Sequence, residues 1–306
     1  MINYLNKIKK FFNKRIFKTP DLKYLIKEKN NTENKKKHVN YWLKHAKKNH
    51  SLFNFFFSPN EYVKKNENID YEFQANKDSV ITDQMFSALA SAGILIIKNA
   101  LPKDERENII CYFSELQKGA YKKNWSEKPQ TLFNDNDTEL TYGSTDISNF
   151  KFLKSYSDQA SQAIYNKIVK PNVDFHYLKL INKSEKLIKG ETYLHSDRFI
   201  PHFKMFYSPH KIDSGDAPFQ FARSSHIVNE NYKNFFINSK SFDETDELSK
   251  YLMNEIITVT VPENTLYISF TNGLHRRSDF KNLKSERCML FLQYVERFNK
   301  FDYLLN

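Results

Sequence analysis

With 306 residues, 40% of them hydrophobic and 15% aromatic, the chain can bury a substantial core, which excludes a mainly disordered protein. Its net charge of +11 favours anionic partners, but no zinc-finger or RRM-like pattern accompanies that charge, so we expect no specific nucleic-acid partner. Two cysteines are too few for a disulfide framework, and neither a signal peptide nor a long apolar run is present, so we predict a cytoplasmic protein.

Residues 1–75 are predicted to form a basic, Lys- and Asn-rich, helical N-terminal extension. Ile2, Leu5, Ile8 and Phe12 have the spacing of one face of a helix. Such a stripe more often packs on its own protein, and we favour that interpretation. Contact with a membrane surface is the alternative.

A compact domain is predicted over residues 76–306. It begins with a helix over 82–92, a buried strand over 94–101 that follows Gly93, and a second helix opened by Pro102. The segment NDNDTELTYGSTD, residues 134–146, is polar and predicts a loop. Residues 155–169 have the pattern of one more helix.

From Pro171 onward the sequence is typical of β structure. Short runs rich in Phe, Tyr, Ile and Val recur at 174–181, 201–208, 218–225, 255–261, 264–270 and 287–295. Many strands without long helices between them favour an antiparallel sandwich or barrel. We therefore predict a mainly β fold with flanking helices, the N-terminal helices of the domain packing on the β core.

The segment ETYLHSDRFIPH, residues 191–202, places His195 and Asp197 two positions apart in a stretch typical of a strand. Side chains two apart on a strand point to the same face, so both can reach one point while Ser196 points away. With a second histidine they would make the set of two histidines and one carboxylate that binds Fe(II) and leaves coordination positions open. The pattern predicts a metal site.

Candidates for the remaining ligand are His202, His210, His226 and His275. His275 is favoured because it follows the buried strand ENTLYISFTNGL and precedes Arg287 by 12 residues. The planar fork of an arginine is suited to the distal carboxylate of a 2-oxoacid that chelates the metal.

Arg276 and Arg277 are rival cations for that carboxylate, although neighbours on a strand allow only one of them to face inward. Tyr193 and Tyr207 can line the same pocket, but core packing is the favoured interpretation for both in a chain with 18 tyrosines.

Four segments resemble the phytanoyl-CoA dioxygenase family of Fe(II)/2-oxoglutarate oxygenases. They are HSD at 195–197, SGDAPFQFARSSH at 214–226, ENTLYISFTNGLHRRSDF at 263–280 and ERCMLFLQY at 286–294. The segment FSALASAGILIIKNALPKDERENI is similar to the opening of the family's domain, so the resemblance runs from about residue 80 to about residue 296. The segment ARSSH, residues 222–226, departs from the family's usual Pro-Gly-Ser-His turn. By the resemblance, His226 would stabilise this turn.

The resemblance implies a double-stranded β-helix, also called a jelly roll or cupin-like core. It implies His195, Asp197 and His275 as ligands of Fe(II), Arg287 as the residue that holds 2-oxoglutarate, and O2 as the oxidant. The implied reaction is hydroxylation of a small organic molecule, and the positive charge of the chain favours an anionic one.

Three alternatives stay open. The same fold could hold another divalent metal in a cupin-like enzyme that does not use 2-oxoglutarate. It could be a binding module without catalysis. The basic N-terminal segment could instead make this a protein of nucleic-acid or membrane surfaces, whose binding would weaken steeply with salt.

Overall fold

The computed structural model of the protein describes residues 70–118, 130–134, 138–165, 168–180, 194–197, 202–238, 255–278 and 286–294, together with positions 33, 36, 37 and 40. Most of the expected basic extension, residues 1–75, including the stripe from Ile2 to Phe12, lies outside the described residues, so that extension stays a prediction. Among the helices of the described part, none combines the length and apolar character needed to cross a membrane.

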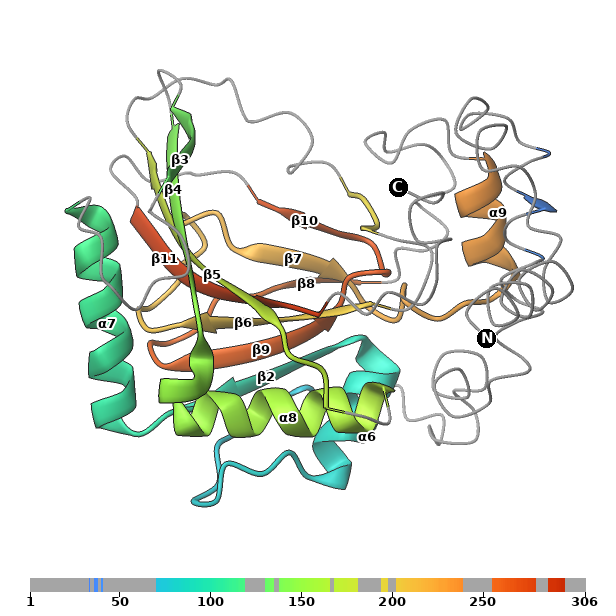
Figure 1. Cartoon of the computed structure of the whole chain (residues 1–306). Coiled ribbons are helices and arrows are strands. Elements are labelled where there is room, and N and C mark those ends of the chain that lie inside the picture. The colour runs from blue at the N-terminus through green and yellow to red at the C-terminus, as the bar shows by residue number, and fades with distance from the viewer. Residues whose placement is uncertain are drawn as a thin grey trace, which may run out of the picture.

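Two β-sheets form the centre of the protein (Figure 1). The large sheet has eight strands in the order β1-β2-β9-β6-β11-β5-β4-β3, and the small sheet has three in the order β10-β7-β8. All the strand pairs are antiparallel except the parallel pair β1 with β2. The strands are β1 (Glu72–Gln74), β2 (Ile94–Lys98), β3 (Gln130–Asn134), β4 (Thr138–Thr145), β5 (Asn172–Leu180), β6 (Phe203–Ser208), β7 (Phe219–Ala222), β8 (Ile256–Thr258), β9 (Thr265–Phe270), β10 (His275–Arg277) and β11 (Glu286–Gln293).

The small sheet packs face to face on the large one. Phe221 of β7 and Ile257 of β8 belong to one buried cluster with Phe206 of β6, Tyr267 of β9 and Met289 of β11. Two facing sheets with helices on the outside confirm the expected mainly β fold with a jelly-roll core.

Helices cover the outer face of the large sheet (Figure 1). They are α6 (Asp83–Ala92), α7 (Lys103–Gln117) and α8 (Lys151–Tyr165), with a single 3-10 turn η1 (Ile147–Asn149) before α8, whereas α9 (Glu230–Asn238) follows β7. Thr82 caps α6 by accepting a hydrogen bond from the Met85 amide, and Gly93 ends it with φ of 83°, a conformation that favours glycine. The predicted order of helix, Gly93, strand and helix is confirmed.

The carboxylate of Glu105 on α7 fixes the start of α8. It accepts hydrogen bonds from the backbone amides of Phe152 at 3.0 Å and Leu153 at 2.8 Å. The first amides of a helix have no partner within the helix, so a carboxylate from a neighbouring helix satisfies them and interacts well with the helix dipole. This contact joins two helices of the outer layer.

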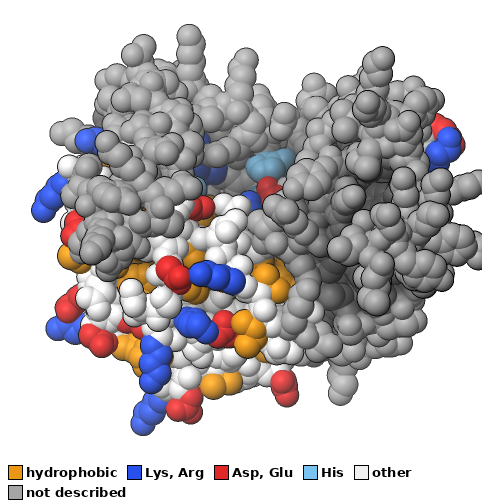
Figure 2. Space-filling model, in the orientation of Figure 1, with side chains coloured by type: hydrophobic (Ala, Val, Ile, Leu, Met, Phe, Trp, Pro, Cys, Tyr) orange, Lys and Arg blue, Asp and Glu red, His pale blue; other side chains and the backbone are white. Residues whose placement is uncertain are grey.

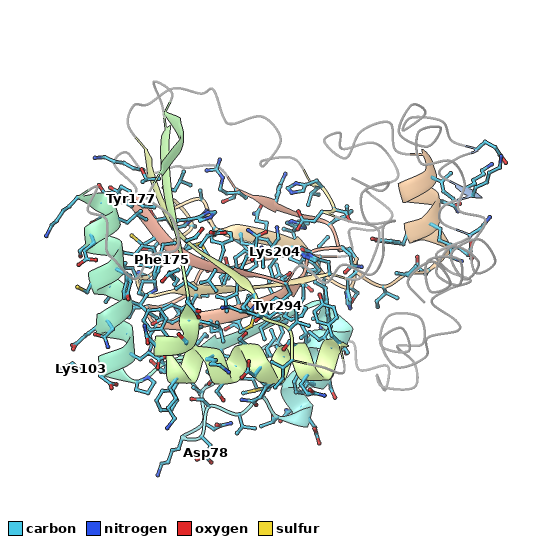
Figure 3. All side chains as sticks on the ribbon, in the orientation of Figure 1. Asp78, Lys103, Phe175, Tyr177, Lys204 and Tyr294 are labelled. Atoms are coloured by element: carbon cyan, nitrogen blue, oxygen red, sulfur yellow. The ribbon has the colours of Figure 1, made fainter. Side chains whose placement is uncertain are left out.

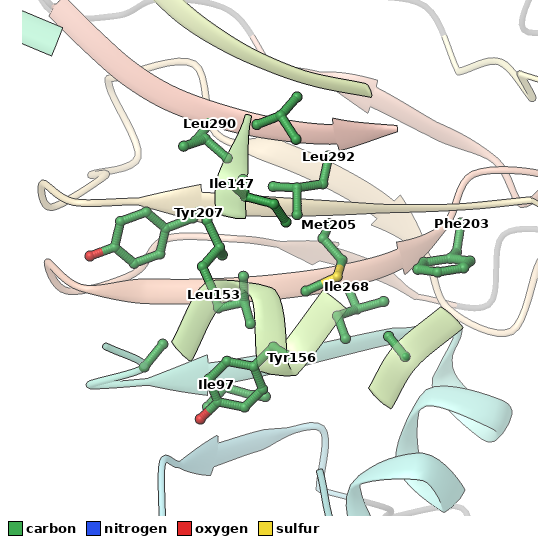
Figure 4. Packing of buried hydrophobic residues seen from close by; sticks show 14 of the residues in the cluster. Ile97, Ile147, Leu153, Tyr156, Phe203, Met205, Tyr207, Ile268, Leu290 and Leu292 are labelled. Atoms are coloured by element: carbon green, nitrogen blue, oxygen red, sulfur yellow. The ribbon is translucent and has the colours of Figure 1, made fainter. Parts of the chain in front are cut away.

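Successive side chains of the central strands point alternately to the two faces of the large sheet. On β6, Met205 and Tyr207 point into the core under the helices, where Leu290 and Leu292 of β11 and Ile268 of β9 meet them (Figure 4). Residues of the opposite parity face the small sheet. The sheet therefore carries a closed hydrophobic core on one face and leaves the other for a site.

The side chains follow this division (Figure 3). Lys103 and Asp78 extend outward from the edge of the protein, while Phe175 and Tyr294 lie in its interior. Tyr294 is fully buried, and its hydroxyl is hydrogen bonded to Ser157 of α8 at 2.8 Å. Because its hydroxyl has a hydrogen-bond partner, this tyrosine can pack in the hydrophobic core.

The loop predicted over residues 134–146 is wrong for most of its length. Residues 138–145 form β4, which pairs with β5 along its whole length and with β3 on its other side. The segment is polar, so its composition does not distinguish it from a loop. Its strand conformation comes from backbone hydrogen bonds to two neighbouring strands.

Candidate metal centre

A cavity of about 340 Å³ opens between the two sheets on the face of the large sheet that the helices leave uncovered. In Figure 2 a histidine side chain lies beside acidic and basic side chains in a recess of the face in view. The cavity is lined by His176, Leu178, His195, Asp197, Lys204, Phe206, Phe219, Tyr267, His275, Arg276, Arg277, Arg287, Met289, Phe291 and Gln293.

The structure brings His195, Asp197 and His275 together in this cavity. One ligand atom from each lies within 4.8 Å of the others. Asp197 Oδ1 is 3.6 Å from His275 Nε2 and 4.0 Å from His195 Nε2. Two imidazole nitrogens and one carboxylate oxygen at such separations can converge on a single metal ion.

The backbone around His195 differs from the expected strand. His195 forms only an isolated bridge with His275, each amide donating to the other's carbonyl at 2.9 Å, and the chain bends at Asp197. The Asp197 amide donates to the Thr271 carbonyl at 2.9 Å. The two histidines are therefore held side by side by backbone pairing.

A set of hydrogen bonds also fixes the turn that precedes His275. The Asn272 carbonyl accepts from the Ser196 hydroxyl at 2.8 Å and from the Tyr232 hydroxyl of α9 at 2.7 Å. Ser196 points away from the cavity, as expected, and is buried. The two segments that carry the ligand set are thus tied to each other at consecutive residues.

The His275 ring is oriented by the turn itself. Its Nδ1 lies 2.9 Å from the Gly273 carbonyl, to which Nδ1 donates, and its Nε2 faces Asp197. A metal-binding histidine commonly has its second nitrogen held in this way. Gly273 has little space, because a Cβ there would lie 2.7 Å from the ring of Phe221.

Lys204 of β6 forms an ion pair with the other oxygen of the carboxylate, Nζ to Asp197 Oδ2 at 2.8 Å. Burial by itself would raise the pKa of Asp197, but His275 and Lys204 hold that pKa well below its usual range. Asp197 is therefore ionised at neutral pH, as a metal ligand must be.

Arg287, the first residue of the strand predicted over 287–295, is the second residue of β11 and lines the same cavity. Its guanidinium donates to the Ala217 carbonyl. His176 lies on β5 and stacks on Phe291 with ring centroids 4.1 Å apart. Burial, with smaller effects of Arg287 and Lys204, lowers the pKa of His176 to about 4, so this imidazole is neutral at pH 7.

The rival arginines both border the cavity, whereas only one was expected to face inward. Arg277 shares the face of His275 and is 8% exposed. Arg276 lies on the other face of β10, where its Nε donates to Gln220 of β7 at 2.7 Å. It borders the cavity nevertheless, since β10 is an edge strand of the small sheet beside the opening between the sheets.

The other predicted candidates have structural roles or lie away from the site. His226 is fully buried in a turn with Nε2 2.9 Å from the Ala90 carbonyl, and His202 is buried against Thr271. His210 is exposed. Tyr207 is in the core, its hydroxyl bonded to Asn264 at 2.9 Å, while Tyr193 lies outside the described residues.

Lys204 and His176 were missed by sequence reasoning. Each is a polar residue between two buried apolar neighbours on a strand, Phe203 and Met205 in one case, Phe175 and Tyr177 in the other. That pattern shows that the polar side chain faces away from the core. Only the structure shows that both faces of these strands are enclosed.

No family model matches the chain, and no curated protein matches it. Solved structures with a similar arrangement include the epimerase SnoN from nogalamycin biosynthesis, in complex with Fe³⁺, α-ketoglutarate and nogalamycin RO. It is 12% identical to this protein, the match covers 68% of this chain and 80% of that chain, and the TM-score is 0.47. EctD from S. alaskensis in its apoform has 13% identity over 73% of this chain and 80% of that one, with a TM-score of 0.45. HygX from Streptomyces hygroscopicus, with nickel and 2-oxoglutarate bound, has 14% identity over 72% of this chain and 89% of that one, with a TM-score of 0.43. At these identities and scores the likeness assigns no activity to this chain.

Proposed function

We propose that the protein is an Fe(II)- and 2-oxoglutarate-dependent oxygenase that hydroxylates a small organic molecule, of the phytanoyl-CoA dioxygenase type. The observation that carries the proposal is the convergence of His195, Asp197 and His275 in one cavity that also contains Arg287. Two imidazoles and one carboxylate are the ligand set of non-haem iron oxygenases.

The residues fit an iron(II) ion. Asp197 is ionised, and His275 presents Nε2 because the Gly273 carbonyl holds Nδ1. Since Lys204 holds Oδ2, the carboxylate presents Oδ1 toward the histidines. Three protein ligands leave positions for a chelating cosubstrate and for O2.

Arg287 is the proposed partner of the distal carboxylate of 2-oxoglutarate. It lies on the same face of β11 as Met289 and Phe291, both of which line the cavity. A guanidinium between apolar walls keeps its charge and binds a carboxylate through two parallel N–H groups. Its contact with the Ala217 carbonyl limits the orientations of the fork.

When bound, iron(II) and 2-oxoglutarate supply the oxidation, in which O2 delivers one oxygen atom to the succinate formed with loss of CO2 and the other to a C–H bond of the substrate. The protein orients these groups through Asp197, the two histidines and Arg287. Phe206, Tyr267 and the other apolar residues of the cavity exclude water.

The test is thermal melting of the metal-free protein, alone, with Mn(II), and with Mn(II) plus 2-oxoglutarate. A ligand at 100 times its Kd adds about 2.7 kcal/mol to the free energy of unfolding. Mn(II) should stabilise the wild type but not Asp197→Ala, and 2-oxoglutarate should add a further rise that Arg287→Ala loses. Asp213→Ala is the control, because Asp213 also pairs with a lysine at 2.8 Å but is exposed.

A catalytic readout completes the test. The Fe(II)-loaded wild type should slowly release succinate from 2-oxoglutarate under O2, and Asp197→Ala should not. Stabilisation by metal alone, with no response to 2-oxoglutarate, would favour the alternative of another metal-dependent cupin-like enzyme. If neither ligand raises the melting temperature, the proposal fails and a binding module is the better interpretation.

A further inference from the structure

The strand that carries His275 continues directly into Arg276 and Arg277. Arg277 stands two residues after the ligand on the same face, so their Cα atoms are about 7 Å apart at the usual rise of a strand. Arg277 is 8% exposed and lines the cavity. A long cationic side chain is thus placed beside the candidate metal ligands, inside the space that the substrate would enter.

The charge of the cavity exceeds what the cosubstrate requires. Within the described lining, the cationic side chains are Lys204, Arg276, Arg277 and Arg287, and Asp197 is the carboxylate that faces them. Lys204 is matched by Asp197 at 2.8 Å. Within the described lining, the positive charge of a bound metal dication, Lys204, Arg287 and the two arginines of β10 would exceed the negative charge of Asp197 and the two carboxylates of 2-oxoglutarate.

The rest of the lining is apolar. Phe206, Phe219, Tyr267 and Phe291 supply aromatic surface around the charged groups. Charges next to such walls interact more strongly than in water, because the local dielectric constant is low. The cavity therefore suits a molecule with an apolar or aromatic-stacking body and a negatively charged group.

The two arginines of β10 have different roles in this arrangement. Arg276 is anchored outside the inward face by its hydrogen bond to Gln220, so it contributes positive potential at the border of the cavity. Arg277, which shares the face of His275, is the one placed to contact a ligand.

We propose that Arg277 binds an oxyanion group, a carboxylate or a phosphate, on the organic substrate and thereby directs the substrate's reacting carbon toward the metal. This proposal rests on the proposed function, since it names the substrate class of the same site. Arg277 is then a specificity-determining residue, distinct from Arg287, which serves the cosubstrate.

The experiment uses the full-length protein loaded with Mn(II) and 2-oxoglutarate, with inorganic phosphate and acetate as probes. Each probe is titrated by calorimetry into the wild type, Arg277→Gln, Arg277→Lys and Arg287→Gln. The ³¹P relaxation of phosphate is also measured, because the paramagnetic Mn(II) broadens only phosphate held near it. Melting of each variant establishes that it is folded, and Arg223→Gln, whose arginine pairs with Glu255 outside the cavity lining, is the control.

We expect Arg277→Gln to bind the preferred probe about tenfold or more weakly, because a hydrogen bond between charged groups is lost, while its affinity for 2-oxoglutarate changes less than about twofold. Arg277→Lys should retain part of the affinity. Tighter binding of phosphate than acetate would name a phosphorylated substrate, and the reverse would name a carboxylate.

Two results would overturn the proposal. Equal probe affinity in wild type and Arg277→Gln would show that Arg277 binds no oxyanion. Loss of 2-oxoglutarate binding in Arg277→Gln but not in Arg287→Gln would make Arg277 the cosubstrate residue. If the wild type binds neither Mn(II) nor 2-oxoglutarate, the proposed function fails instead, and phosphate titration of the metal-free protein still decides whether Arg277 forms an anion site.

Discussion

Replacing Lys204 with methionine tests whether the ion pair in the cavity behaves as a buried one. Lys204 Nζ lies 2.8 Å from Asp197 Oδ2, and the two side chains are 20% and 21% exposed. Removing one partner of a buried pair costs about 3–5 kcal/mol, whereas exposed pairs contribute about 0–1 kcal/mol. With a fifth of each side chain accessible, Lys204→Met should lose about 2–3 kcal/mol of unfolding free energy in metal-free protein.

The assay is urea unfolding at pH 7 with a chelator present. Lys211→Met is the matched control, since Lys211 also lies 2.8 Å from an aspartate oxygen but is 66% exposed, and it should change stability little. A double-mutant cycle of Lys204→Met with Asp197→Asn should give a coupling of about 1–3 kcal/mol. A coupling near zero would show that the pair is screened by water, and its description as a largely buried pair would then be wrong.

Three further predictions concern the residues around the site. Gly273→Ala should lower the free energy of unfolding by about 1–3 kcal/mol, because the new Cβ would lie 2.7 Å from a buried ring, and urea unfolding measures this loss. The substitution should also weaken Mn(II) binding about 10–100-fold, measured by calorimetry, because it displaces the carbonyl that orients His275. Glu105→Ala should lower the free energy of unfolding by about 1–2 kcal/mol, because two amides at the start of α8 lose their hydrogen-bond acceptor. Its affinity for Mn(II) should stay unchanged, and a change would contradict the separation of core and cavity. Glu107→Ala is the control, since Glu107 is exposed. Burial lowers the pKa of His226 from 6.5 to about 4, so the unfolded state takes up the proton first as the pH falls. The free energy of unfolding should therefore decrease by up to about 3 kcal/mol between pH 6.5 and pH 4. Urea unfolding of His226→Gln over the same range should show a smaller decrease.

Local sequence patterns predicted much of the outer architecture. Thr82, Gly93 and Pro102 mark the ends of α6 and the start of α7, because capping and left-handed backbone depend on the residue itself. The strands rich in Phe, Tyr, Ile and Val lie where their composition predicted them, as β5, β6, β9 and β11. These features depend on neighbours within a few positions, which the sequence contains.

Polar strands could not be predicted in this way. Thr138–Thr145 forms β4 because β3 and β5 hydrogen bond to its backbone on both sides. The local sequence does not indicate which strands a backbone segment will pair with. The bend at Asp197 has the same origin, since its amide is bonded to Thr271 from a distant segment.

By itself the sequence determined which residue types were available for a site: the HxD pair, His275 later in the chain, and Arg276, Arg277 and Arg287 after it. Only the tertiary structure decided that His195 and His275 lie side by side, that Lys204 neutralises Asp197, and that a cavity joins them to Arg287. The physical reason is that His195 and His275 come from distant segments, while Lys204 and Arg287 lie on the large sheet and His275 lies on the small one, so their geometry follows from the packing of the whole domain.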